Sequence, residues 1–253
     1  MAATETDLVL ERFVSAVRQA VPTLAVWAHG SLALGDFQPG RSDLDLIAVV
    51  DVPLDGEAKD RLALMHQRFV EEEPAAAKLH CSYMVRAELA EARADHVTWA
   101  HGTILDRPVT PVTRRELLEG GLTLHGPPPV ELLPPLLPGQ LEDFIRRDLE
   151  EFWLPATGKP LLWLRDIWVD LGLLVLARAT VTLRDGRLIT KGEALTELRN
   201  LGAPADLVRD LHDRRYAHPA PLSRLPRIRR ALRARAFVRR GIKHTLTTKK
   251  LQR

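Results

Sequence analysis

The feature that most constrains the fold is a proline-rich segment near the middle of the chain. Six prolines lie between Gly126 and Gly139. Proline fixes φ and has no backbone N–H, so this segment is expected to be neither a helix nor a central strand. We predict that it separates two domains, residues 1–138 and residues 139–253.

The two halves differ in their hydrophobic patterns. Before the prolines, apolar periodicity predicts helices and short buried strands. The expected helices are residues 7–21 and 57–73, and the expected strands are 24–28, 44–50 and 79–85. After the prolines, every long segment has helical periodicity, at residues 140–153, 160–183, 191–201, 205–216 and 222–245. The chain is therefore predicted to be α+β, with a mixed sheet and helices in the N-terminal domain followed by an all-α bundle domain.

Composition indicates an ordinary soluble protein, with 45% hydrophobic and 27% charged residues. Cys81 is the single cysteine, which excludes an intramolecular disulfide and favours a reducing compartment. The acidic N-terminus does not resemble a signal peptide, and the apolar runs are too short to span a bilayer. We expect a cytoplasmic protein with no membrane partner.

The charge of the chain is unevenly distributed. Residues 213–253 contain 14 Lys or Arg against one acidic residue, whereas the whole chain has a net charge of +3. Such a segment can bind nucleic acid, anionic lipid or nucleotide phosphates, or it can be the solvated face of a helix that packs on an acidic body. Phe237 is the only Phe or Trp of this segment, so the segment lacks the set of aromatic side chains on which the bases of a single-stranded nucleic acid would stack. A nucleic-acid partner is therefore not expected.

The chemistry-bearing residues lie between the first two expected strands. Gly30 and Ser31 follow the first strand, and Asp43 and Asp45 open the second, directly after Ser42. Side chains alternate along a strand, so both carboxylates are expected on one face, where they can hold Mg²⁺. Glycine allows close approach of a phosphate, and Ser31 adds a hydroxyl and a backbone donor. Neither short motif is specific alone, but together they predict transfer of a nucleoside monophosphate from ATP, with pyrophosphate leaving.

The segment from His29 to Leu46 resembles the signature of the polymerase-β-like nucleotidyltransferases. Within that superfamily the chain most resembles the aminoglycoside nucleotidyltransferases of the streptomycin/spectinomycin adenylyltransferase type. The proline-rich segment is similar to the family's link into its helical domain. Leu174–Arg178 and Asp185–Lys191 resemble two segments of that domain.

This resemblance implies an antibiotic-resistance enzyme with Mg²⁺ and ATP bound between two domains and a hydroxyl-bearing aminoglycoside as acceptor. It implies that Asp43 and Asp45 are metal ligands and that Gly30 and Ser31, with Ser42 beside them, bind the nucleotide phosphates. Lys191 is expected to reach the triphosphate from the second domain, the alternative being a surface lysine.

The chain departs from the family pattern at the third carboxylate. In the family this residue is a metal neighbour and general base, and here His80 stands at the corresponding strand position. His80 can act as the general base in place of the carboxylate, or it can coordinate the metal. Alternatively, its presence indicates that the domain has lost catalytic activity, or His80 is only a structural residue. The candidate substitute carboxylates are Glu88, Asp143, Glu150 and Glu151.

The resemblance places acceptor contacts near the start of the long helix of the second domain. Asp166 and Asp170 lie four residues apart, hence on one helical face, where they can pair with ammonium groups. Trp163 can stack on a sugar ring or a cation. The alternative is a core helix with buried tryptophans and solvated aspartates.

Three functions follow from these residues. The first is adenylyl transfer to a small cationic acceptor, catalysed by Asp43, Asp45 and His80. The second is nucleotide binding without turnover, and the third is a nucleic-acid-directed nucleotidyltransferase or binding module. A monomer and a dimer are equally compatible with the sequence.

Overall fold

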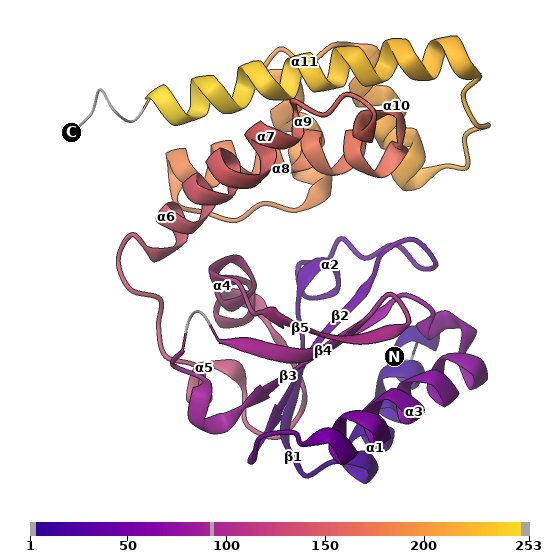
Figure 1. The fold of residues 1–253 in the computed structure, drawn as a ribbon, viewed down its shortest axis with the longest axis vertical. Coiled ribbons are helices and arrows are strands. Elements are labelled where there is room, and N and C mark those ends of the chain that lie inside the picture. The colour runs from indigo at the N-terminus through magenta and orange to yellow at the C-terminus, as the bar shows by residue number, and fades with distance from the viewer. Residues whose placement is uncertain (1–3, 92–93, 249–253) are drawn as a thin grey trace. The chain divides into compact units, whose positions relative to one another are not determined.

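The computed structural model describes residues 4–91 and 94–248 (Figure 1). Contacts between residues divide the chain into two compact units, Met1–Pro138 and Gly139–Arg253. The first unit contains a sheet with helices on it, and the second contains only helices within its described residues. The predicted α+β fold class is confirmed.

The first unit is built on a six-stranded sheet in the order β5-β4-β3-β2-β1-β6. The strands are β1 (Thr23–Ala28), β2 (Leu44–Val50), β3 (Leu79–Val85), β4 (Asp95–Ala100), β5 (Thr103–Pro108) and β6 (Leu122–His125). β2 and β3 are parallel and the other neighbouring pairs are antiparallel. β2 and β3 can run parallel because a helix connects them. The three strands expected from the sequence are β1, β2 and β3.

Helices cover both faces of this sheet (Figure 1). One face packs against α1 (Glu5–Ala20) and α3 (Gly56–Glu72), with Phe13 and Leu62 fully buried there. The other face packs against α4 (Pro111–Gly120), where Trp27 lies in a second core cluster. Both faces of the central strands are therefore buried, which explains why β1, β2 and β3 read as nearly continuous apolar runs.

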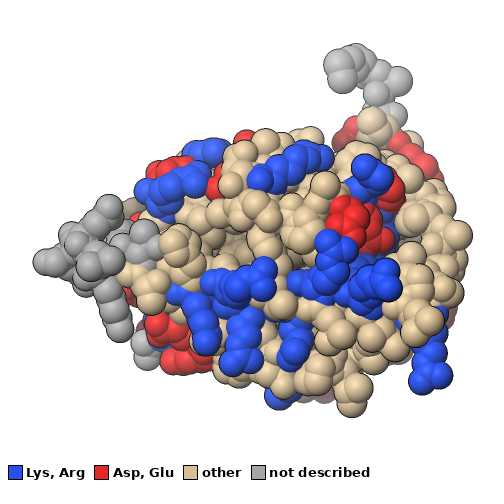
Figure 2. Space-filling view, turned by 90° about the horizontal axis from the view of Figure 1, so that it is seen from above, with Lys and Arg blue, Asp and Glu red and all other residues tan. Residues whose placement is uncertain are grey.

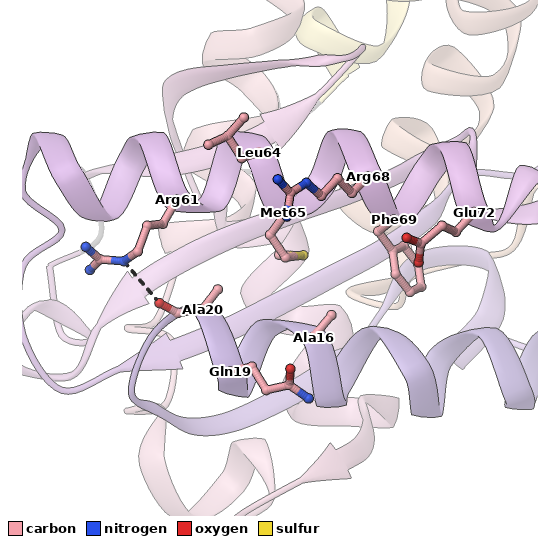
Figure 3. Close-up of a pocket in the computed structure, with 9 residues that line it drawn as sticks. All are labelled: Ala16, Gln19, Ala20, Arg61, Leu64, Met65, Arg68, Phe69 and Glu72. Carbon is pink, nitrogen blue, oxygen red and sulfur yellow. Dashed lines mark hydrogen bonds between the residues drawn. The ribbon is translucent and has the colours of Figure 1, made fainter.

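The two helices on the first face lie side by side and leave a groove of about 390 Å³ between them (Figure 3). Its lining includes Met65 and Phe69 from α3 and Ala16 from α1. The Arg61 side chain bridges the groove by donating to the Ala20 carbonyl at 3.4 Å. None of the residues predicted for the functional site lines this groove.

No helix or strand is predicted from the sequence for residues 86–125, where the structure has β4, β5, α4, β6 and the short helical turn η2 (Arg86–Glu88). β4 buries His96 and Thr98, and β5 has no buried residue, so neither strand shows a clear apolar signal. The proline-rich segment also differs from expectation, because it contains one helical turn, α5 (Pro129–Leu132). Its prolines are tolerated because the first turn of a helix does not use their missing N–H groups.

The second unit is a helical bundle around α8 (Asp166–Asp185), which packs against α6, α9 and α11. The remaining elements are α6 (Gln140–Arg147), the π-helix η3 (Asp148–Trp153), α7 (Leu154–Ala156), η4 (Leu162–Leu164), α9 (Lys191–Asn200), α10 (Ala205–Tyr216) and α11 (Arg224–Thr248). The helix expected at residues 160–183 begins only at Asp166, because Arg165 is extended with ψ 132°. None of the helices in residues 4–91 and 94–248 has both the length and the apolar character that a membrane span requires.

Two glycines allow close packing around α8. A Cβ on Gly172 would lie 2.5 Å from the Trp163 ring, and a Cβ on Gly241 of α11 would lie 2.5 Å from the Leu176 side chain. Both distances are too short for real carbon contacts, so a larger residue at either position would force the packed elements apart.

Candidate active site

Sheet topology brings the predicted phosphate and metal residues to one edge of the first unit. β2 and β3 begin at this edge, and the antiparallel β1 ends there. The backbone N–H of His29 donates to the Asp45 carbonyl at 3.0 Å, and Asp45 is the register partner of His80. Asp45 is therefore flanked by a histidine on each neighbouring strand. Asp43 lies directly before β2 and is half-buried, and its place on the same face as Asp45 stays a prediction.

Gly30 occupies a position that only glycine fills without strain. Its φ is +63°, in the left-handed region, and it opens the single-turn helix α2 (Gly30–Ala33). A Cβ there would lie 2.8 Å from Asp45 Oδ2. The backbone of the Gly-Ser turn therefore rests directly against the Asp45 carboxylate, which is the arrangement required if a phosphate is to contact both.

The two serines have different surroundings. Ser31 is the second residue of α2 and is half-buried. Ser42 is buried, and its Oγ accepts a hydrogen bond from the Gln38 N–H at 3.0 Å while its own N–H donates to the Gln38 carbonyl at 2.9 Å. Ser42 thus closes the loop that leads into Asp43. This contact gives Ser42 a structural role, and the predicted contact with the nucleotide stays a prediction.

His80 lies beside the carboxylate that it was expected to accompany. Its Nδ1 is 3.6 Å from Asp45 Oδ1, and 12% of its side chain is exposed. Its ring makes an edge contact with the ring of His101 at a centroid distance of 4.8 Å. His101 is the only non-glycine residue with positive φ in the described chain, at 54°, in the two-residue turn between β4 and β5. Gly102 also has a positive φ, of 78°, as two-residue hairpin turns of type I′ require.

Sequence reasoning missed a histidine–glutamate pair at the same edge. His29 Nδ1 lies 3.2 Å from Glu116 Oε2, and both side chains are largely buried, with 13% and 8% exposed. Glu116 comes from α4, more than eighty residues away in sequence, so no local spacing signals the pair. The only sequence feature that pointed to this pair was a polar residue, His29, directly before the Gly-Ser turn. Glu116 places a buried carboxylate close to the phosphate loop.

Of the proposed substitutes for the third carboxylate, Glu88 is wrongly placed. It belongs to η2, which follows the end of β3, whereas His80 stands at its beginning. A strand of this length separates the two positions by roughly 20 Å. Asp143, Glu150 and Glu151 belong to α6 and η3 of the second unit.

The donor set at the edge fits Mg²⁺. The structure groups no three or more His, Cys, Asp or Glu side chains in a metal-binding arrangement within its described residues. Asp43 and Asp45 supply two hard oxygen ligands, and Mg²⁺ usually keeps its other positions for water and substrate phosphates. The Gly30 backbone lies against the Asp45 carboxylate, so a phosphate held by this turn would lie close to that ligand. Imidazole suits Mg²⁺ less well, so His80 is the less suitable ligand.

The predicted acceptor carboxylates have arginine partners within the second unit. Arg214 of α10 donates through Nε to both carboxylate oxygens of Asp170 at 3.0 Å, and Arg230 of α11 pairs with Asp166. Asp210 accepts from both arginines. Burial raises the pKa of the Asp170 carboxyl, although the Arg214 hydrogen bonds act in the opposite direction. These carboxylates hold three helices together, so an ammonium group would have to displace an arginine to reach them.

Trp163 is a correction to the sequence prediction. Its side chain is fully buried against Gly172, and its indole N–H donates to the Ala156 carbonyl at 3.1 Å. It is a core residue and presents no face to a ligand. Lys191 is the first residue of α9, directly after the N-cap Thr190, and is half-buried. Its contact with a nucleotide stays a prediction.

Comparisons with known proteins agree with this geometry. Residues 10–96 match the family model of the nucleotidyltransferase domain. This range includes the Gly-Ser turn, Asp43, Asp45 and His80. Over these residues the chain is similar to a nucleotidyltransferase domain. The model covers about a third of the chain, so it describes the first unit only. No match was found among curated proteins.

A solved structure extends the likeness to nearly the whole chain. It is the crystal structure of spectinomycin adenyltransferase AAD(9) from Enterococcus faecialis with ATP and spectinomycin. The TM-score is 0.73, and the alignment covers 93% of this chain and 98% of that one. Sequence identity is 13%, so the likeness shows a shared fold. The predicted resemblance to the spectinomycin adenylyltransferase type is confirmed at the level of fold.

Proposed function

We propose that this protein transfers AMP from ATP to a hydroxyl of a small cationic acceptor of the aminoglycoside type, with release of pyrophosphate. The observation that carries the proposal is that the Asp45 carboxylate lies against the Gly30 backbone at one end of the sheet, with Asp43 two residues before it in the chain. The nucleotidyltransferase family match and the fold shared with spectinomycin adenyltransferase support it.

Each residue has a role that follows from its position. Gly30 and Ser31 would cradle the phosphates, and Asp43 and Asp45 would hold Mg²⁺, which neutralises charge on the reacting phosphates. The acceptor oxygen forms a bond to the α-phosphorus, the bond from that phosphorus to the bridging oxygen breaks, and pyrophosphate leaves with the electron pair. We assign the acceptor proton to His80, which stands beside Asp45 in place of the third carboxylate.

The test measures pyrophosphate release from ATP with Mg²⁺ across streptomycin, spectinomycin, kanamycin-type and lincosamide acceptors. Asp43→Asn and Asp45→Asn are expected to abolish turnover. Asp51→Asn is the matched control, because Asp51 is exposed at the other end of β2 and should leave the rate unchanged. Full activity in both site variants would refute the proposal. ATP binding without turnover on any acceptor would favour a nucleotide-binding protein of the same fold.

The role of His80 needs a separate pair of variants. We expect His80→Ala to lower kcat by about 10²-fold or more, the usual contribution of a general base. His80→Glu restores a carboxylate at the position and should retain much of the activity with an altered pH–rate profile. Equal activity in the wild type and His80→Ala would remove His80 from the mechanism and direct attention to Glu116.

A further inference from the structure

The exposed side of α11 carries an unusual accumulation of positive charge. α11 spans Arg224–Thr248 and contains no Asp or Glu. Five of its cations form what we call the outer cation face: Arg229, Arg233, Arg239, Arg240 and Lys243, all of them exposed. Figure 2 shows a band of Lys and Arg side chains across the surface, with acidic side chains at its margins.

Helix geometry puts these five side chains on one surface. At 3.6 residues per turn they fall within an arc of roughly 120°, and at 1.5 Å per residue they extend over about 21 Å. The opposite side of the helix is buried, with Ala234 and Val238 at 0% exposure. The outer cation face therefore points to solvent because the other side of α11 is packed into the bundle.

The arginines on the inner and outer sides of α11 differ in their partners. On the inner side, Arg230 pairs with Asp166 and Asp210, and Arg235 donates to the Thr157 carbonyl at 2.9 Å. On the outer side, only Arg233 has an ion pair, with Asp206. Within residues 4–91 and 94–248 the structure gives the side chains of Arg229, Arg239, Arg240 and Lys243 no hydrogen bond or ion pair. The inner cations hold the bundle together, whereas of the five outer ones only Arg233 links α11 to another helix, through Asp206 of α10.

The outer cation face costs the protein stability. Arg229 and Arg233 are four residues apart, as are Arg239 and Lys243, and like charges at this spacing destabilise a helix by a few tenths of a kcal/mol per pair. No acidic residue of α11 offsets this repulsion. A polyanion bound along the helix would remove the repulsion and release counterions.

We propose that the outer cation face of α11 binds the phosphodiester backbone of double-stranded nucleic acid. Four of its five cations are arginines, whose planar guanidinium groups can bind phosphate through two hydrogen bonds. Proteins that bind single strands stack the unpaired bases on exposed aromatic side chains. Phe237 of α11 is buried, so the outer cation face favours a double strand, bound through its phosphates, over a single strand. Leu225 and Leu232 are the only large hydrophobic residues of α11 that are exposed, which is little apolar surface for insertion into a membrane interface.

Fluorescence anisotropy with a labelled duplex of about 20 base pairs, prepared as DNA and as RNA, tests this surface. We expect binding at about 50 mM salt that weakens steeply by about 200 mM, as for proteins that neutralise several phosphates. The variant Arg229→Gln/Arg239→Gln/Arg240→Gln/Lys243→Gln should weaken binding at least tenfold. It should also reduce the magnitude of the slope of log K against log salt by up to about 3.6 for DNA, because each of the four lost phosphate contacts contributes about 0.9.

The first unit offers a control with the same loss of charge. Arg12, Arg18, Arg61 and Arg68 are exposed on α1 and α3, and their joint change to Gln should alter affinity less than about threefold, since net charge alone acts weakly. Thermal melting of both variants checks that they are folded. Absence of duplex binding at low salt, or an equal loss in the two variants, would overturn the proposal. Binding to anionic phospholipid vesicles but not to either duplex would overturn it too and assign the surface to a membrane.

Discussion

Two regions were predicted to be functional: the sheet edge of the first unit and the start of α8 in the second unit. The predicted residues have different surroundings in these two regions. At the sheet edge, Asp45, Gly30 and His80 come together as strand register requires. At the start of α8, Asp166 and Asp170 share a helical face as expected, but arginines from α10 and α11 pair with them. Closely spaced aspartates therefore lie beside a glycine turn and a histidine in the first unit, and in contacts that hold three helices together in the second.

Gly30→Ala should produce the largest effect, because it disturbs the sheet edge directly. The added Cβ would displace the Asp45 carboxylate. We expect the rate of pyrophosphate release to fall by about 10³-fold, equivalent to about 4 kcal/mol of transition-state stabilisation. Gly35→Ala is the matched control: its φ is +70°, yet a Cβ there has no neighbour within 4 Å. Both variants lose about 1 kcal/mol of stability from backbone strain, but only the first should lose activity. Equal activities would contradict the assigned contact.

Arg214→Met should show that the start of α8 is structural. The change removes the Arg214 contacts of Asp170, leaves Asp210 with Arg230 alone, and should lower the free energy of unfolding by about 3 kcal/mol. Chemical denaturation measures this loss, and the double variant Asp170→Leu/Arg214→Met should recover part of it. If Asp170 were an acceptor contact instead, removing Arg214 would lower the KM for the acceptor.

Acid should weaken the first unit before the second. His66 is fully buried in the core between α1, α3 and the sheet, stacked on Trp99 and 2.7 Å from the Tyr83 hydroxyl. Desolvation by burial lowers the pKa of His66 to about 3, from 6.5. The unfolded chain therefore binds a proton that the folded chain rejects. Stability is complete above pH 6.5 and is lost as pH falls toward 3, by about 1.4 kcal/mol per pH unit.

At about pH 5, His66 alone should lower the free energy of unfolding by about 2 kcal/mol. Carboxylate–arginine pairs such as Asp166–Arg230 should still be intact at this pH. Denaturation curves at several pH values measure the loss. His66→Phe keeps an aromatic ring against Trp99 and should flatten the pH dependence between 6.5 and 4. An unchanged slope in that variant would assign the acid sensitivity to another group.

Thr190→Ala should have the smallest effect of the four. Thr190 accepts from the Glu193 N–H at 3.0 Å, and Glu193 accepts from the Thr190 N–H at 2.8 Å, which forms a capping box at the start of α9. Loss of such a cap costs about 1 kcal/mol. Thermal unfolding should show this small loss while turnover under saturating ATP stays the same. A large fall in turnover would instead link the start of α9, and with it Lys191, to the reaction.

The sequence was informative where the signal is local. Strands β1 to β3 are rich in buried apolar residues, and the alternation of side chains along a strand predicts a common face for Asp43 and Asp45. β4 and β5 were missed because β4 mixes buried His96 and Thr98 with buried Trp99 and Ala100, and β5 has no buried residue. Trp163 was misjudged because an aromatic residue in a helical pattern can face the core or a ligand with the same spacing. Its close contact with Gly172, nine residues later, depends on how the chain turns back after η4.

By itself the sequence determined the α+β class, the turn at Gly30 directly after the first strand, and the position of Asp45 near the start of the second. These features depend on backbone periodicity and on glycine's access to positive φ, which act within a few residues. Only the tertiary structure decided that Glu116 pairs with His29, that His80 meets Asp45, and that Arg214 and Arg230 occupy the acidic face of α8. Those partners lie tens of residues apart, and burial decides between them because a buried charge must find an opposite charge wherever the fold supplies one.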